Sequence, residues 1–352
     1  MLNYHEILAT AMFRPINPHV PVVLWAIGQT YAPFAKIPDN EYYADPAKML
    51  EAQVKFYERF PDVLTIPGIW PDLGLMAELG ALGAELEFPD DAPPQSRGGA
   101  FEDIREVENW EVPDPKKADY TSQTLDYLKY FCKHLPEEPR KKWGFLDGHI
   151  FCGGPGEISG LLLGYDKFSY AMYDYPQLVH ILLRKVTDFI KSYIDAQIEI
   201  VGEPKRVIIW DHIPGMLSRE LFDEFIHPYM KEVFTHVEKA TLRIYHNENN
   251  YPHLLDLMRD IPANVCHIGP KHDLVESKRV LKKCVMGNVH PIQELLLGTN
   301  EEIEAKCKTI IETAGRGGGL WLSTGGGMAP ETPVEKMQVL IDCTKKYLPP
   351  SL

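Results

Sequence analysis

The chain has 352 residues, of which 45% are hydrophobic, 11% aromatic and 24% charged. These proportions are typical of a folded globular protein and exclude a disordered, fibrous or membrane-embedded chain. Asp and Glu (50) outnumber Lys and Arg (36), which leaves a formal charge of −14. Because this charge repels nucleic acid phosphates and anionic lipids, we expect neither nucleic acid nor a membrane as a partner.

The sequence starts MLNYHEILATAMFRP, without a basic stretch followed by an apolar run, and nowhere has about 18 consecutive apolar residues. We therefore expect a cytoplasmic protein with neither a signal peptide nor a spanning helix. The six cysteines are not spaced as CxxC or as a zinc finger. We expect them to be reduced and mostly buried.

Short apolar runs recur along the chain and are typical of buried parallel strands, since each is rich in β-branched or aromatic residues and closes on turn-forming or polar ones. The eight runs are 20–27, 62–66, 144–151, 206–210, 242–246, 264–268, 284–289 and 319–323.

Amphipathic helical patterns lie between these runs. The longest is predicted from Pro176 to a C-cap at Gly202. Another begins at Ser218 and is expected to break at His227-Pro228, because proline cannot continue the helical hydrogen bonds. Capping signals predict three further helix starts, which are Asp45 before Pro46, Thr299 with Glu302, and Thr332 with Pro333 and Glu335.

Eight alternations of strand and helix predict a single (β/α)8 TIM barrel that spans residues 1–352 as one α/β domain. The alternative is an open doubly wound sheet, which gives the same alternation. Such a sheet usually carries a GxGxxG or GxxxxGK[ST] loop, and the sequence has neither. We interpret residues 84–115, which are acidic, rich in proline and aperiodic, as an irregular insertion.

Catalytic side chains of a parallel barrel gather where its strands end. The residues that follow the predicted strands are mostly polar or aromatic, and they are Gln29, Tyr31, 67–70, Cys152, Glu157, Asp211, His212, His246, Glu248, Asn249, His267, Asn288, His290 and 323–327.

Asp211 and His212 end a strand that has no other charge after Arg206. A carboxylate at this position can orient a proton, hold an imidazole or bind a cation. The alternative interpretation of Asp211 is a cap on a helix or a turn.

His246 and Glu248 belong to the densest cluster of potential ligands in the chain, HNENN. With one residue between them, they can point to the same side and bind one divalent metal ion, for which zinc is the candidate. Alternatively, His246 and Glu248 act in acid–base catalysis or hydrogen bonding without a metal, or they have only a structural role. A metal would need further ligands, and the candidates are Asp211, His212, His267 and Glu157.

Four aromatic residues, Trp25, Tyr31, Trp70 and Trp210, can line a pocket for a flat ligand, although each can also belong to the core. The glycine-rich stretch 315–327 looks like a phosphate-binding loop but lacks the Lys-Ser/Thr pair that such loops carry. We interpret it as a place of close backbone packing or of approach by a flat ligand.

Several segments carry a resemblance to a known family. They are FCGGPGEISGLLLGYDKF, IIWDHIPGMLSRELFDEFIHPYMKEV, YHNENN, GNVHPIQELLLGTNEEIE and the closing glycine-rich stretch. With them the chain resembles the uroporphyrinogen decarboxylase superfamily over most of its length. The resemblance implies a (β/α)8 barrel with the active site at its mouth, in agreement with the strand pattern.

This superfamily contains the decarboxylases of haem synthesis and cobalamin-linked methyltransferases. A decarboxylase is expected to carry arginines after the first strand, in a motif like RQAGR, to pair with the carboxylates of its substrate. This chain has WAIGQTYAPF there, and Gly326 stands where a histidine of the closing loop is expected. Both departures argue against porphyrinogen decarboxylation.

Methyltransferases that act on coenzyme M resemble the chain better, and they bind zinc through HxCGN and a cysteine of the closing loop. His246 matches the histidine, but Glu248 and Gly326 replace the two cysteines. Imidazole and carboxylate ligands suit an oxygen-containing substrate better than a thiol. The resemblance, with these departures, predicts a corrinoid-dependent methyltransferase component that demethylates an O-methyl substrate, such as an aryl methyl ether.

The methyl group would pass to a corrinoid carried by a separate partner protein, and a homodimer is also allowed. The predicted catalytic residues are Asp211, His212, His246 and His267, the predicted substrate-binding residues are Trp25, Tyr31, Trp70, Asn249 and Asn288, and the predicted zinc ligands are His246 and Glu248. The alternatives are methyl transfer from a corrinoid to a thiol, uroporphyrinogen decarboxylation, and a non-catalytic barrel that binds a corrinoid or tetrapyrrole.

Overall fold

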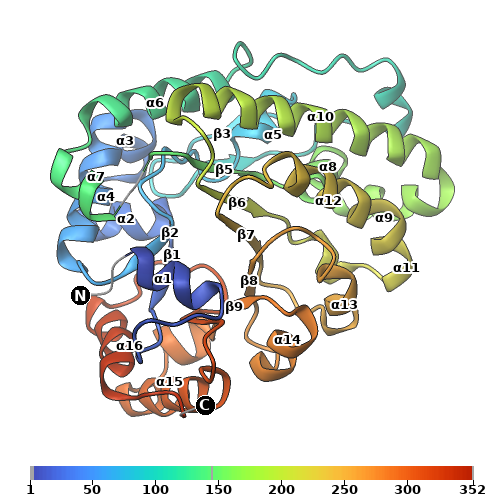
Figure 1. Cartoon of the computed structure of the whole chain (residues 1–352). Coiled ribbons are helices and arrows are strands. Elements are labelled where there is room, and N and C mark those ends of the chain that lie inside the picture. The colour runs from blue at the N-terminus through green and yellow to red at the C-terminus, as the bar shows by residue number, and fades with distance from the viewer. Residues whose placement is uncertain (1–3, 144–145, 351–352) are drawn as a thin grey trace.

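The computed structural model describes residues 4–143 and 146–350 (Figure 1). Within these ranges, eight parallel strands match the eight predicted runs one for one. They are β1 (Val23–Ala26), β2 (Leu64–Pro67), β5 (His149–Gly153), β6 (Arg206–Trp210), β7 (Leu242–Asn247), β8 (Val265–Ile268), β9 (Cys284–Val289) and β10 (Leu320–Thr324). The first two residues of the predicted run 144–151 lie outside the described residues.

The order of the strands is that of a barrel. β5 to β10 form one sheet in chain order, and β1 pairs with β2. A parallel bridge from Val22 to Leu322 places the first strand beside the last. A doubly wound sheet would instead reverse its strand order at a switch point. The (β/α)8 class is therefore confirmed, although within the described residues no backbone pairing joins β2 to β5 and closes the ring.

Side-chain amides satisfy the backbone on both sides of this gap. Gln197, on the long helix α10 (Pro176–Val201), accepts from the Phe151 N–H and donates to the Phe151 carbonyl, both at 3.1 Å. Gln53, on α4 (Pro46–Arg59), pairs in the same way with Trp70 at 2.9 and 2.8 Å. Each amide thus replaces a missing neighbouring strand, because its oxygen and nitrogen imitate a peptide unit.

Replacing Gln197 with leucine is expected to destabilise the barrel strongly. Leucine has a similar volume but leaves the buried N–H and C=O of Phe151 without a partner, which should lower the free energy of unfolding by about 2–4 kcal/mol. Chemical denaturation measures the difference. Gln177→Leu, at an exposed position of the same helix, is the control, and an equal effect of the two changes would contradict this role of Gln197.

The helices flank the strands, and α10 runs along one side of the molecule beside α6 (Figure 1). The remaining α-helices are α1 (Tyr4–Ala11), α2 (Gly28–Ala35), α3 (Asp39–Ala44), α5 (Ala77–Ala81), α6 (Thr121–His134), α7 (Glu137–Trp143), α8 (Pro155–Leu163), α9 (Tyr165–Asp174), α11 (Arg219–Leu221), α12 (His227–His236), α13 (Leu255–Met258), α14 (Leu274–Leu281), α15 (Asn300–Ala314) and α16 (Val334–Lys346).

Most of the predicted helix ends are confirmed. Asp45 caps α4 by accepting from the Ala47 N–H, Gly202 follows α10 with φ 82°, and Thr299 forms the predicted capping box with α15. The capping box predicted at Thr332 is wrong. Its hydroxyl donates to the Ala329 carbonyl instead, so it stabilises the preceding turn and leaves α16 to start after a proline.

The helix predicted from Ser218 begins there, with the Ser218 hydroxyl accepting from the Leu221 N–H. The predicted break at His227-Pro228 is wrong. A π-helical turn over Phe222–Ile226 joins α11 to α12 and places Pro228 in the first turn of α12. Proline is tolerated in that position because the first helical residues need no N–H donor.

The predicted insertion at 84–115 is more regular than expected. β3 (Leu86–Glu87) and β4 (Gln95–Ser96) form a short antiparallel pair, and a 3₁₀ helix covers Ile104–Glu108. Asp103 and Glu106 cap this helix reciprocally. A short pair and a single capped turn leave no periodic pattern, which is why the sequence predicted only irregular chain.

Two expectations drawn from composition can be compared with the structure. Within the described residues no helix is long and apolar enough to cross a membrane. The six cysteines are free thiols, five of them buried and Cys132 partly buried. The prediction of reduced, mostly buried cysteines is therefore confirmed.

Candidate active site

Three predicted histidines meet at the carboxyl ends of adjacent strands. His246 on β7 lies directly opposite His267 on β8, and His212 follows the end of β6. The Nε2 atoms of His212 and His246 are 3.3 Å apart, and the Nδ1 atoms of His246 and His267 are 2.5 Å apart. The prediction that these side chains gather at the barrel mouth is confirmed.

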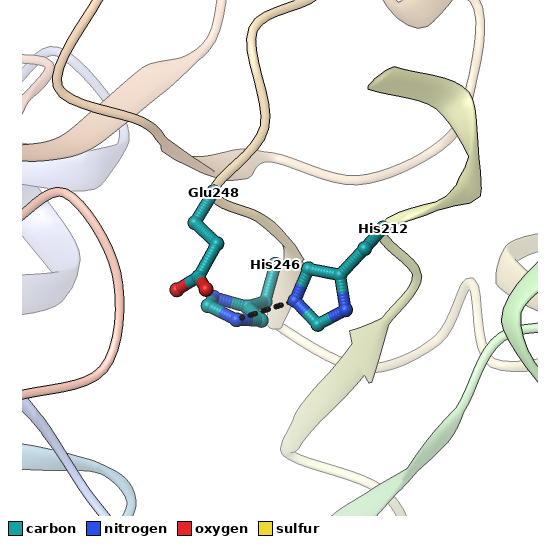
Figure 2. Close-up of side chains that lie close together, drawn as sticks. All are labelled: His212, His246 and Glu248. Atoms are coloured by element: carbon teal, nitrogen blue, oxygen red, sulfur yellow. Dashed lines mark hydrogen bonds between the residues drawn. The ribbon is translucent and has the colours of Figure 1, made fainter. Parts of the chain in front are cut away.

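Glu248 completes the cluster, and Figure 2 shows its carboxylate directed toward the rings of His212 and His246. Gly327 donates its N–H to Oε2 of Glu248 at 3.0 Å. A Cβ atom at Gly326, which has φ 144°, would lie only 2.3 Å from the same oxygen. The carboxylate therefore fills the space that a side chain at position 326 would need.

The donor set fits a divalent metal ion. One ligand atom each from His212, His246 and Glu248 lies within 4.8 Å of the other two. Two nitrogen ligands bound tetrahedrally to zinc at about 2.0–2.1 Å would lie about 3.3–3.4 Å apart, and the two Nε2 atoms are 3.3 Å apart. Among the further ligands predicted for His246 and Glu248, His212 is thus the one that faces them.

Glu157 holds His212 from behind. From the first turn of α8, its Oε2 accepts the backbone N–H of His212 at 2.8 Å, and its Oε1 lies 3.6 Å from Nδ1. Tyr165 donates its hydroxyl to Oε1 at 2.6 Å. Burial alone would lower the pKa of His212, but the hydrogen bond and charge of Glu157 raise it. The same contacts lower the pKa of Glu157 against the opposing effect of its burial. Nδ1 of His212 thus faces a carboxylate, while Nε2 faces the cluster.

His246 and His267 are buried and stay neutral at neutral pH. Burial, followed by the nearby His267 and His212, lowers the pKa of His246 well below its usual value. Burial lowers the pKa of His267 to about 4. The Trp25 ring stacks on His246 with centroids 3.7 Å apart and an interplanar angle of 6°. This stacking fixes the plane of the His246 ring.

Asp211, a predicted catalytic residue, faces away from the imidazoles. Its Oδ2 accepts the Gly156 N–H at 2.9 Å in the first turn of α8, and a Cβ at Gly154 would lie 2.5 Å from that oxygen. His212 follows with helical backbone angles (φ −93°, ψ −17°), and its imidazole lies in the cluster while the Asp211 carboxylate lies against α8. The alternative interpretation as a helix cap is the one that fits.

This placement predicts a pH effect on stability. Burial, and then the charge of Glu157, raise the pKa of Asp211 to about 8. Because the pKa is higher in the folded chain than the unfolded value of about 3.9, stability falls as pH rises from about 4 to about 8. Asp211→Asn keeps an acceptor for Gly156 and does not titrate. We expect it to exceed the wild type by about 1–3 kcal/mol in unfolding free energy at pH 8 and by much less at pH 4.

Denaturant titrations at the two pH values measure this difference, with the exposed Asp174→Asn as control. A variant no more stable than the wild type at pH 8 would contradict the buried, protonated carboxyl.

Two aromatic residues predicted to bind substrate lie in the core instead. Tyr31 is 1% exposed, and its hydroxyl donates to the Thr65 hydroxyl at 3.2 Å. Trp70 is 2% exposed and packs its ring edge-on against His149. Both follow strands in the sequence, but the chain turns them inward behind the strand ends. Their assignment to substrate binding stays a prediction, although these contacts place both rings in the core rather than beside the three clustered imidazoles.

Asn288 is also placed differently from the prediction. It is buried, and its amide donates to the carbonyls of His272 at 2.8 Å and Gly269 at 3.2 Å, so it braces the loop after β8. Asn249 lies at the cluster, partly buried, and donates to the His212 carbonyl at 2.8 Å. Of the predicted substrate-binding residues, Trp25 and Asn249 are therefore the ones beside the imidazoles.

Two contacts of the site were not predicted from the sequence. Tyr165 reaches Glu157 from α9, and the Thr324 carbonyl at the end of β10 lies 2.8 Å from Nε2 of His267. The first depends on the turn between two helices. The second involves a backbone atom, which carries no residue-type signal.

Imidazoles and carboxylates at the carboxyl ends of the strands of a (β/α)8 barrel place the protein in the class of TIM-barrel enzymes. A family model described as "Uroporphyrinogen decarboxylase (URO-D)" matches residues 5–347. The chain therefore belongs to the uroporphyrinogen decarboxylase family, as its motifs predicted.

Relatives with known names cover most of the chain. A uroporphyrinogen decarboxylase of Geobacter sp. (strain M21) is 27% identical over 340 residues, 95% of this chain and 96% of that protein. One of Mannheimia succiniciproducens is 26% identical over 309 residues, 83% and 78% of the two chains. Among solved structures, a methyltransferase from Methanosarcina mazei superposes with a TM-score of 0.79 at 21% identity, covering 97% of each chain. This likeness supports the fold.

Proposed function

We propose that the protein is a methyltransferase component that removes a methyl group from an O-methyl substrate, such as an aryl methyl ether, for transfer to a corrinoid on a separate protein. The observation that carries the proposal is the cluster of His212, His246 and Glu248, a set of nitrogen and oxygen donors without sulfur. The methyltransferase from Methanosarcina mazei, which shares the fold, supports the reaction type.

Zinc is the metal we propose for the cluster, with His212, His246 and Glu248 as ligands. The 3.3 Å separation of the imidazole nitrogens and the hard carboxylate donor support this choice. A bound metal ion would supply a Lewis acid that neutralises the charge developing on the ether oxygen, while the reduced corrinoid would supply the nucleophile. Three protein ligands leave a fourth position for that oxygen.

The surrounding residues prepare the site for this step. Glu157 holds His212 in place through its backbone N–H. Trp25 covers one face of His246 and excludes water from it. Asn249 holds the carbonyl of His212 and lies partly exposed beside the cluster, where a substrate oxygen can approach. These contacts keep the donors in one geometry before the substrate arrives.

The alternatives have less support. Transfer to a thiol is usually served by zinc with cysteine ligands, and here Glu248 and Gly326 stand in place of cysteines. The decarboxylase names of the relatives favour decarboxylation. However, the net charge of −14 and the absence of arginine from WAIGQTYAPF disfavour a substrate with many carboxylates. A homodimer stays a prediction.

The test is to incubate the purified protein with a reduced corrinoid protein and a panel of methoxylated aromatics, methylated thiols and methylamines. Cobalt absorbance reports the formation of methylcobalamin, and metal analysis of the same preparation reports zinc. We expect methylation with at least one ether. Methylcobalamin formation with methylated thiols alone would contradict the proposed substrate class. Decarboxylation of uroporphyrinogen would contradict the proposed reaction.

A further inference from the structure

His267 lies behind His246, outside the proposed set of metal ligands. We propose that it is a positioning residue that fixes the proton of His246 on Nδ1, so that His246 presents a bare Nε2 atom to the barrel mouth. This inference rests on the proposed function for its purpose, since a bare Nε2 is what a metal ligand needs. The inference follows from which atom donates and which accepts in a short series of hydrogen bonds that ends at His246.

The chain of groups starts at the Thr324 carbonyl, which can only accept a hydrogen bond. Nε2 of His267 lies 2.8 Å from this oxygen. It must therefore carry a proton, because a bare nitrogen would place two lone pairs against each other at that distance. His267 is fully buried, and burial without a charged partner disfavours a second proton, so the one ring proton resides on Nε2. Its Nδ1 is consequently bare and can only accept.

The next contact fixes His246. Its Nδ1 lies 2.5 Å from Nδ1 of His267. Because the His267 nitrogen is bare, the His246 nitrogen must donate the hydrogen between them. His246 is buried as well, which disfavours a second proton on its ring, so the remaining nitrogen, Nε2, is bare. This is the atom that lies 3.3 Å from Nε2 of His212, beside the carboxylate of Glu248.

The fold holds this chain of groups rigidly. His246 and His267 are register partners in the parallel pair β7–β8, so backbone hydrogen bonds set their spacing. The Trp25 ring, stacked at 3.7 Å, prevents His246 from turning out of plane. Burial excludes water that could replace either hydrogen bond.

The two imidazoles of the cluster are oriented in different ways. Glu157, a carboxylate, faces Nδ1 of His212 at 3.6 Å, whereas His246 depends on a neutral imidazole and a carbonyl. Metal-bound histidines commonly donate their second N–H to such a partner, and loss of the partner typically costs 10- to 100-fold in metal affinity. His267 is thus expected to affect the metal without contacting it.

The experiment compares three variants by zinc or Co²⁺ titration of the purified full chain. His267→Leu removes the acceptor for His246, and we expect metal affinity to fall about 10- to 100-fold. His267→Asn places Oδ1 near the position of the lost Nδ1, and we expect affinity to return to within about threefold of the wild type. Cys266→Ala, on the same strand, is the control for packing changes and should bind as the wild type does.

The ¹⁵N spectrum of the histidine rings in the metal-free wild type gives a second readout that does not depend on folding of a variant. A protonated Nδ1 and bare Nε2 on His246 support the inference, and a protonated Nε2 overturns it. Equal metal affinity of His267→Leu and the wild type also overturns it. If the wild type binds no metal, the proposed metal site fails, while the ring spectrum still decides the role of His267.

Discussion

His246→Ala is expected to abolish metal binding and lower methyl transfer by at least about a hundredfold, because it removes the central ligand of the proposed site. His246 contacts His212, His267 and Trp25 together. Its loss therefore removes both a ligand and the ring that aligns the others. Metal content and the rate of methylcobalamin formation are the two measurements.

The control for His246→Ala is His236→Ala on α12, where the imidazole pairs with Asp195 at 2.8 Å near the surface. This variant should keep both the metal and the activity. Circular dichroism checks that the His246 variant folds. If it lost the metal but methylated the corrinoid at the wild-type rate, metal-assisted cleavage would be wrong, and the histidines would act without an ion.

The fold was predictable because its signal repeats. Each buried strand is marked in the sequence by an apolar run, and most flanking helices are marked by a capping signal. A wrong prediction at a single position, such as the capping box at Thr332, therefore does not change the predicted topology. The gap between β2 and β5 was not predictable. It depends on Gln197 and Gln53 reaching backbone groups far away in the sequence.

The candidate site was predictable where side chains are close in sequence or follow a strand end. His246 and Glu248 are separated by one residue and do converge. The contact of Asp211 with the Gly156 N–H was not predictable in this way, because it joins residues that are far apart in the sequence. The packing of Tyr31 and Trp70 in the core was not predictable, since position after a strand does not specify which way a residue turns in the following loop or helix.

Gly326→Ala is expected to weaken the proposed metal site although glycine contributes no ligand. The new Cβ would lie 2.3 Å from Oε2 of Glu248, so the carboxylate must move. A displaced ligand should lower metal affinity by at least about tenfold, comparable to the loss of a supporting contact. Gly98→Ala is the matched control, because Gly98 has a similar φ of 157° but no atom within 4 Å of the added Cβ.

Backbone strain is the competing cause of such an effect, since φ 144° is unfavourable for alanine. A double-mutant cycle separates the two causes. In a Glu248→Ala background no carboxylate remains to be displaced, so the added methyl group should change metal affinity little. If Gly326→Ala instead lowered the affinity equally in both backgrounds, strain would be the cause, and the carboxylate would not depend on the glycine. If Gly326→Ala lowers metal affinity only when Glu248 is present, the glycine at 326 is what leaves room for the carboxylate ligand.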